Sequence, residues 1–246
     1  MGREIERELR QRGCHTDFIE LESGCTRINV KVKEVCGRES ELNGNGPEID
    51  ERGLKRLEEK VSALQDQDTL ILSGNVPQGV AADVYGRLAA AAQGKRVTLV
   101  VDAEKSLLFP ALPYRPFLIK PNLSELSGML GKRLKTREEL AEGSRELQEK
   151  GARNILVSLG RDGAFFLSEN GEELWINAPK GTVINTVGSG DSMVAGFISS
   201  RECGKSLREC ACYAVAAGSA GAFSELLPER GRTEQLYREI SENQLA

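Results

Sequence analysis

From Thr69 onward, short apolar runs alternate with amphipathic stretches of helical length, and this alternation restricts the fold more than any other feature. Strand-like runs followed by helices typically form βα units, in which neighbouring strands are parallel. The expected strands occupy residues 69–73, 97–102, 116–120, 154–159, 164–168 and 174–178. The expected helices occupy residues 80–93, 136–151, 191–202, 206–222 and 233–241. We therefore predict an α/β protein with a mainly parallel central sheet.

The region before Thr69 has a different pattern. Residues 26–33, TRINVKVK, alternate strictly between polar and apolar side chains, and residues 43–47, NGNGP, are typical of a turn. A period of two predicts a strand with one polar face. We expect an antiparallel hairpin that forms a flap, over about residues 24–48, beside the main sheet. A solvated edge strand explains the polar face equally well.

Composition limits the class of protein. The 246 residues are 39% hydrophobic and 28% charged, with a formal net charge of −4, which is typical of a globular domain and not of a nucleic-acid-binding surface. No apolar run reaches the roughly 18 residues of a membrane span, and the first residues lack the apolar stretch of a signal peptide. We expect a cytoplasmic protein with no nucleic-acid or membrane partner.

Metal clusters and a Ser-His-Asp triad are poorly supported by the residue types present. The chain has a single histidine, and its six cysteines include no closely spaced pair of the kind that binds zinc. We expect the thiols to be reduced and mostly structural, as is usual for cysteines in the cytosol.

The sharpest signal is the segment Gly188-Ser189-Gly190-Asp191, a glycine-rich turn that opens a helix. Bare amides at a helix N-terminus favour a phosphate or a developing negative charge. A carboxylate at such a place repels an anion, so Asp191 is better suited to receive a proton from a hydroxyl. A glycine turn with Asp191 as a helix cap is the plain alternative.

Two other nucleotide motifs are excluded. The dinucleotide fingerprint G-x-G-x-x-G needs a third glycine at position 193, which is Met193, and no early βαβ unit frames the segment. The phosphate-binding loop G-x-x-x-x-G-K-[ST] occurs nowhere in the chain.

A second cluster follows the expected strand 116–120. In open α/β sheets, ligands gather at the carboxyl ends of strands. Lys120 is placed to meet a polyphosphate, and Asn122 and Glu125 are placed to hold magnesium through its water shell. The spacing N-x-x-E serves a helix capping box equally well.

Two further turns follow expected strands. Residues 157–163, VSLGRDG, form either a nucleotide-contacting loop or a tight turn. Residues 73–77, SGNVP, can present a hydroxyl or an amide, and turn chemistry explains them as well. Polar and glycine-rich turns at four strand ends of one chain favour a shared ligand site over independent capping.

Taken in order, the segments TRINVKV, SGNVP, KPNLSEL, VSLGRDGA and NTVGSGDSMVAGF resemble the PfkB-type carbohydrate kinases of the ribokinase superfamily, and GSGD is the most specific of them. The resemblance runs from about Gly13 to the C-terminus. It implies a ribokinase-like three-layer α/β/α fold with a small β lid. Within the family the chain looks most like bacterial 1-phosphofructokinases, with tagatose-6-phosphate kinases next, and Asn185 is typical of both groups.

The resemblance also implies a reaction and a set of roles. ATP and Mg²⁺ would be the cofactors, and fructose 1-phosphate, or else tagatose 6-phosphate, the substrate. Asp191 would be the catalytic base, with the anion hole at Gly188, Ser189 and Gly190. ATP would contact Lys120, Ser158, Gly160, Gly163, Ala217 and Gly218, and Asn122 and Glu125 would organise Mg²⁺. The sugar phosphate would contact Arg27, helped by Lys31, and the turn Ser73, Gly74 and Asn75.

One departure from the family pattern changes the expectation for the whole chain. Members begin with a strand that carries a sugar-binding aspartate and a glycine-rich segment leading into a helix, whereas this chain opens with residues 3–12, which read as a helix. We therefore expect residues 1–246 to form a single kinase domain without the usual N-terminal part. Two functions stay open, an active sugar-phosphate kinase and an inactive remnant that binds only the nucleotide. A structural protein that dimerises through the exposed strand TRINVKV is a third, but it leaves GSGD unexplained. A homodimer through the lid strand is the expected assembly.

Overall fold

A six-stranded sheet forms the centre of the computed structural model, which describes residues 1–33, 39–77 and 79–245. The strands lie side by side in chain order, and the first four are parallel while the last two are antiparallel. They are β3 (Thr69–Ser73), β4 (Thr98–Asp102), β5 (Leu118–Ile119), β6 (Asn154–Ser158), β7 (Ala164–Leu167) and β8 (Glu173–Ile176). The predicted, mainly parallel sheet is confirmed.

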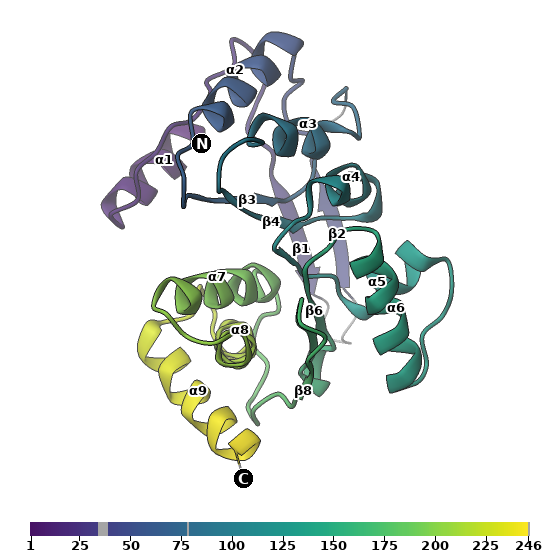
Figure 1. The fold of residues 1–246 in the computed structure, drawn as a ribbon. Coiled ribbons are helices and arrows are strands. Elements are labelled where there is room, and N and C mark those ends of the chain that lie inside the picture. The colour runs from purple at the N-terminus through teal and green to yellow at the C-terminus, as the bar shows by residue number, and fades with distance from the viewer. Residues whose placement is uncertain (34–38, 78, 246) are drawn as a thin grey trace.

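Helices cover both faces of this sheet, so the molecule has three layers (Figure 1). One layer contains α2 (Glu51–Ser62), α3 (Val84–Ala91), α4 (Lys105–Ala111), α5 (Leu123–Leu130) and α6 (Arg137–Glu149). The other contains α7 (Ser189–Glu202), α8 (Leu207–Ala222) and α9 (Arg230–Leu245). The strands supply both cores by alternation, because Leu118 packs toward α7 and α8 whereas the next residue, Ile119, packs toward the opposite layer.

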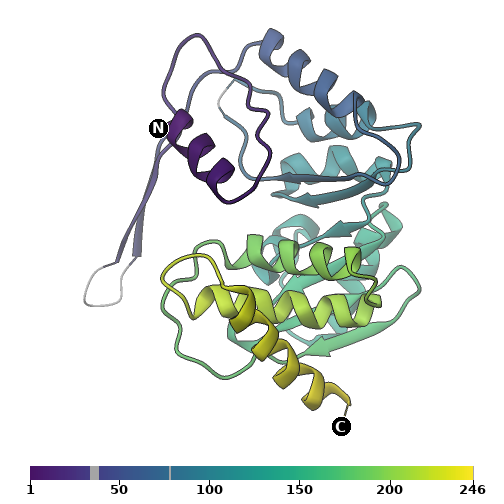
Figure 2. The same ribbon diagram turned by 90° about the vertical axis from the view of Figure 1, so that its left-hand side faces the viewer.

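A separate two-stranded sheet stands beside this body. Strands β1 (Asn29–Lys33) and β2 (Glu39–Asn43) pair antiparallel, with Asn29 opposite Asn43, and Figure 2 shows the hairpin projecting outward. The predicted hairpin is therefore confirmed. One of its faces exposes Ile28, Val30, Val32 and Leu42, each at least 44% accessible. The hairpin thus presents apolar side chains to solvent.

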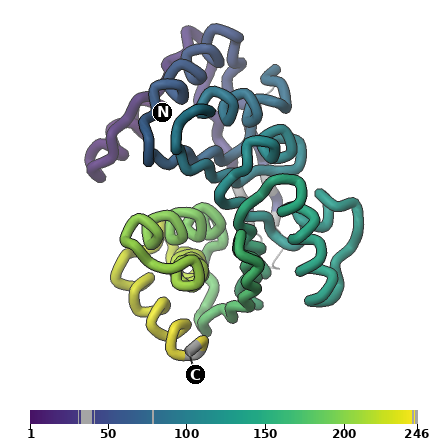
Figure 3. Tube along the Cα trace, viewed as in Figure 1, coloured from purple at the N-terminus to yellow at the C-terminus, as the bar shows by residue number. Residues whose placement is uncertain are grey.

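The ends of the chain lie on opposite sides of the molecule (Figure 3). Helix α1 (Gly2–Gln11) confirms the helix expected at residues 3–12, and it has no buried residue. At the other end, α9 is longer than the expected 233–241. No helix among the described residues is long and apolar enough to cross a membrane.

Some helices and strands differ in their bounds from those predicted, and two helices were not predicted. Helix α3 begins at Val84 instead of residue 80, and β5 has only two residues. Helix α2 was not predicted, although Asp50 caps it and Leu54 and Val61 carry its buried face at helical spacing. Helix α4 was also missed, because Pro110 lies inside it and proline normally ends a helix.

The cysteines follow the expected pattern only in part. Cys210 and Cys212 are buried in α8, as structural cysteines are, and burial raises the pKa of both thiols. Cys14, Cys25 and Cys203 are exposed, and all five described cysteines are free, which agrees with the prediction of reduced thiols. Cys36 lies outside the described residues.

The turn between β6 and β7 depends on two glycines with different surroundings. Gly163 has φ of +93°, and a Cβ there would lie 1.9 Å from the carbonyl oxygen of Ile176. Gly160 has φ of +60°, but nothing lies within 4 Å of the position of its Cβ. The first glycine is required by space and conformation, and the second by conformation alone.

We expect Gly163→Ala to lower the free energy of unfolding by about 4 kcal/mol, because the strand β8 must move to admit the methyl group. Gly160→Ala is the matched control and is expected to cost only about 1 kcal/mol, the price of a left-handed backbone at an alanine. Urea denaturation followed by circular dichroism measures both values. Equal losses in the two variants would contradict the close approach to Ile176.

Candidate active site

The polar positions predicted at strand ends do lie at one edge of the sheet. Ser73 ends β3 directly opposite Asp102 at the end of β4, and Lys120 follows β5. Asn122 forms a bridge with Ser158, the last residue of β6. Because β3 to β6 are parallel and adjacent, their carboxyl ends form a single row that crosses the sheet.

Lys120 connects this row to the first turn of α7. Its side chain is only 7% exposed, and its Nζ lies 3.3 Å from Oδ1 of Asp102. The same Nζ is 3.0 Å from the point where a Cβ on Gly190 would stand. The ammonium therefore lies between the end of β4 and the glycine-rich turn, where the absence of a side chain leaves room for it.

Asp102 is a site residue that the sequence analysis missed. The signal was present, because the run VTLVVD ends in an aspartate at the carboxyl end of a buried strand. Burial raises the pKa of Asp102, and the nearby negative charges of Asp191 and Glu125 raise it further, while Lys120 opposes them. Asp102 thus feels the negative charge of two other carboxylates and the positive charge of one ammonium group.

The glycine-rich turn has the geometry of an anion site. Gly188 is the N-cap of α7, with φ of +75°, so the alternative that places Asp191 as the cap is wrong. The first backbone hydrogen bond within the helix runs from Ser192 to Gly188, so the N–H groups of Gly190 and Asp191 have no acceptor within the helix. Within the described part of the chain, the buried hydroxyl of Ser189 also has no hydrogen-bond partner.

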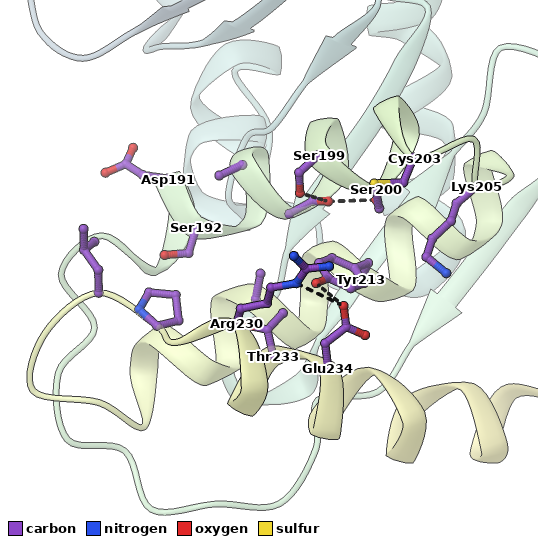
Figure 4. Close-up of a pocket in the computed structure, with 15 residues that line it drawn as sticks. Asp191, Ser192, Ser199, Ser200, Cys203, Lys205, Tyr213, Arg230, Thr233 and Glu234 are labelled. Atoms are coloured by element: carbon purple, nitrogen blue, oxygen red, sulfur yellow. Dashed lines mark hydrogen bonds and ion pairs between the residues drawn. The ribbon is translucent and has the colours of Figure 1, made fainter. Parts of the chain in front are cut away.

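The carboxylate of Asp191 is exposed, and it does not enter the core. It stands at one end of a cavity of about 560 Å³ between α7, α8 and the start of α9, as Figure 4 shows. Away from Asp191, the hydroxyl of Tyr213 donates to Glu234 over 3.0 Å and Arg230 lies beside the same carboxylate. A proton acceptor that is open to solvent and close to free amides can receive a proton from a bound alcohol.

Asn122 and Glu125 form the capping box that was the alternative to a metal site. Oδ1 of Asn122 accepts from the amide of Glu125, and Oε2 of Glu125 accepts from the amide of Asn122, each over 2.8 Å. The cap needs only one carboxylate oxygen of Glu125, so the two roles are compatible. In the described part of the chain, no group of three histidine, cysteine or acidic side chains is arranged to hold a metal ion directly.

The small residues predicted to contact ATP have structural functions in this fold. Gly218 lies where a Cβ would come within 2.4 Å of Cγ of Met193, and it allows α8 to pack closely against α7. Ala217 is buried next to it and lines the cavity that begins at Asp191. Ser158 is half-buried at the end of β6, and the neighbouring glycines form the turn described above.

The structure brings the residues predicted to contact the sugar phosphate together only in part. Nε of Arg27 donates to the carbonyl of Gly44 over 2.9 Å at the base of the hairpin, and no described contact joins Arg27 to Asp191. The side chain of Lys31 lies outside the described residues. The turn after β3 is closer to the centre, because Ser73, Gly74 and Asn75 follow the strand that pairs with β4.

Comparison with known proteins identifies the family of the chain. Residues 1–225 match the pfkB family carbohydrate kinases. The chain belongs to this family. It is 37% identical over 244 residues to a 1-phosphofructokinase of Bacillus subtilis, which covers 99% of this chain and 79% of that protein. It is also 36% identical to a D-tagatose-1-phosphate kinase of Bacillus licheniformis, covering 97% of this chain and 78% of that protein.

Solved structures agree with this assignment. The kinase superposes on a putative phosphofructokinase from Staphylococcus aureus with a TM-score of 0.85 at 37% identity, covering 96% of this chain and 76% of that one. Phosphofructokinase-2 from Escherichia coli gives a TM-score of 0.89 at 28% identity, covering 98% and 79%. The predicted ribokinase-like architecture is therefore confirmed, and the chain is a carbohydrate kinase, an enzyme that phosphorylates an alcohol group.

Tyr85 lies near Asp102, and its hydroxyl makes the stability of the kinase depend on pH. Its hydroxyl donates to the carbonyl of Gly74 over 3.0 Å, and burial, with the charge of Asp102, raises its pKa to about 12. The folded state therefore keeps this phenol neutral while the unfolded chain ionises it above about pH 10. Its contribution to stability is present below that pH and is lost as the pH rises to about 12.

We expect Tyr85→Phe to lower the free energy of unfolding by about 1 kcal/mol at neutral pH, because the hydrogen bond to Gly74 is lost. Between about pH 10 and pH 12 the variant should lose stability less steeply than the wild type does. Urea unfolding at several pH values measures both effects. If the variant and the wild type lost equal amounts of stability between about pH 10 and pH 12, the hydroxyl of Tyr85 would not be the group that makes the stability depend on pH.

Proposed function

We propose that this kinase transfers the γ-phosphate of ATP to a hydroxyl of a sugar phosphate, and that fructose 1-phosphate is converted to fructose 1,6-bisphosphate. The observation that carries the proposal is the arrangement at the start of α7. There an exposed carboxylate, Asp191, stands beside amides without helical acceptors and beside the ammonium of Lys120. Such a set of groups suits proton removal next to an anion.

In this reaction Asp191 accepts the proton of the sugar hydroxyl. The resulting oxygen forms a bond to the γ-phosphorus, and the bond from that phosphorus to the bridging oxygen of ATP breaks, so that ADP leaves with the electron pair. The amides of Gly190 and Asp191 and the ammonium of Lys120 stabilise the charge on the transferred group. Positioning and charge stabilisation of this kind account for most of the catalysis in phosphoryl transfer.

The charge balance of the site supports a requirement for Mg²⁺. The carboxylates of Glu125 and Asp191 act on Asp102 through their charges, and Lys120 is the cation that pairs with Asp102. A polyphosphate would add more negative charge to this surplus, so a divalent cation that accompanies the nucleotide would offset the repulsion. Asn122 and Glu125 would hold this cation through water molecules, because the capping box leaves Oε1 of Glu125 and the second lone pair on Oδ1 of Asn122 without a partner in the box.

The remaining site residues are assigned to the two substrates. We assign Ser158, Gly160, Gly163, Ala217 and Gly218 to the neighbourhood of ATP. We assign Arg27, Lys31, Ser73, Gly74 and Asn75 to the sugar phosphate. Relatives named 1-phosphofructokinase favour fructose 1-phosphate. A relative named D-tagatose-1-phosphate kinase makes a tagatose phosphate the second candidate, tagatose 6-phosphate included.

A substrate panel tests the proposal. With ATP and Mg²⁺ present, we expect ADP release to depend on the sugar phosphate and to be fastest with fructose 1-phosphate. Fructose 1-phosphate, fructose 6-phosphate, tagatose 1-phosphate and tagatose 6-phosphate should be compared in a coupled ADP assay. Nucleotide binding without ADP release for any sugar would support the inactive remnant instead.

Asp191→Asn is the decisive variant in the same assay. Removal of the base should lower kcat by about 100-fold or more, whereas ATP should still bind, because the amides and Lys120 remain. Glu202→Gln makes the same chemical change at the far end of the same helix and should leave kcat unchanged. Near-normal turnover in Asp191→Asn would refute its role as the base.

We also propose that two copies of the kinase pair through the hairpin of β1 and β2. Its exposed face holds Val30 directly opposite Leu42, and these side chains are 46% and 65% accessible. Burial of such a face against an identical one would remove apolar area from water at roughly 25 cal/mol per Å². A closed pairing of this type is the commonest assembly of identical chains.

The double variant Val30→Asp with Leu42→Asp should be monomeric under conditions in which the wild type is a dimer. Analytical ultracentrifugation over a range of concentrations measures the assembly state. Leu226→Asp is the matched control, because Leu226 is 81% exposed but lies outside the hairpin. A wild type that sediments as a monomer at every concentration would contradict the proposed pairing.

A further inference from the structure

The ammonium of Lys120 occupies an unusual place for a cation. It is almost fully buried, and it lies against Gly190 in the first turn of α7, at the positive end of the helix dipole. Cations are disfavoured at this end of a helix, and a buried ammonium is costly without a partner. Another group must therefore hold Lys120 where it is.

Asp102 has the position and the charge to do so. It is the ion-pair partner that the structure gives Lys120, and its own side chain is only 16% exposed. It ends β4, which is hydrogen-bonded to β5, so the backbones that carry the two partners are fixed relative to each other. Glu125 and Asp191 also act on Asp102 through their charges, and Tyr85 lies close enough to sense it.

The space for the ammonium is set by Gly190. Any side chain at this position would place a Cβ 3.0 Å from Nζ and 3.4 Å from Cε of Lys120. The lysine is thus held from two sides, by the carboxylate of Asp102 and by the backbone of the helix. An ammonium fixed at this point lies beside the glycine-rich turn, in which the N–H groups of Gly190 and Asp191 have no acceptor within the helix.

We propose that Asp102 is a positioning residue of the kinase reaction, whose carboxylate holds the Lys120 ammonium against Gly190 at the place where the transferred phosphate is bound. This inference rests on the proposed function, because it gives Asp102 a role in the same reaction. Asp102 acts through Lys120 and takes no proton from the substrate, a task that belongs to Asp191.

A double-mutant cycle on kcat tests the coupling. Asp102→Asn should lower kcat by roughly 100-fold, because a displaced charge no longer meets the phosphate. Lys120→Met should lower kcat at least as much, and adding Asp102→Asn to it should cause no further loss, because the lysine through which Asp102 acts is gone. Asp66→Asn is the control for breaking an ion pair elsewhere, since Asp66 pairs with Arg96 at the surface.

Two results of the cycle would contradict the proposal. If the losses in kcat multiply in the double variant, Asp102 acts independently of Lys120 and the proposal is wrong. It is equally wrong if Asp102→Asn keeps the wild-type kcat. The double variant also guards against a folding defect, because it leaves no single buried charge unpaired, and circular dichroism of all variants reports whether they are folded.

A crystal structure of Asp102→Asn gives a readout that does not depend on activity. We expect Nζ of Lys120 to leave its place against Gly190, and an ammonium that stays there would overturn the proposal. If the wild type shows no sugar-dependent ADP release, the proposed function fails, while this structure still shows whether Asp102 holds Lys120 in place.

Discussion

Parallel hydrogen bonding between β3, β4, β5 and β6 is the constraint on which the site depends. It brings four strand ends, far apart in the chain, to a single edge of the sheet. Each strand that ends there is followed by a turn instead of a direct continuation, so polar side chains and backbone groups meet at that edge. The chemistry of the kinase follows from this row.

Close packing between α7 and α8 fixes the other half of the site. Small residues make it possible, since a Cβ on Gly196 would come within 2.7 Å of Ala217, and one on Gly218 would meet Met193. The buried aromatic ring of Phe197 then anchors α7 on the sheet against Phe166. This packing places the first turn of α7 beside Lys120, which follows the end of β5.

Local features were predictable from the sequence, and contacts between distant segments were not. The capping box of Thr136 and Glu139, the hairpin and the glycine-rich turn before α7 follow from short patterns, and the structure contains all three. The ion pair between Asp102 and Lys120 depends on which strands become neighbours, and no spacing in the sequence predicts this. For the same reason the cavity beside Asp191 was unforeseen, because three helices must first pack to form it.

Lys120 has a consequence for how the folding of this kinase can be followed. Its amine is enclosed between a strand and a helix that come from separate parts of the chain. Fraying of either terminus leaves its ion pair with Asp102 and its contact with Gly190 in place, and the contact with Gly190 is lost when the sheet and α7 separate. Loss of the contact between Lys120 and Gly190 therefore reports the separation of the two halves of the core, whichever end of the chain frays first.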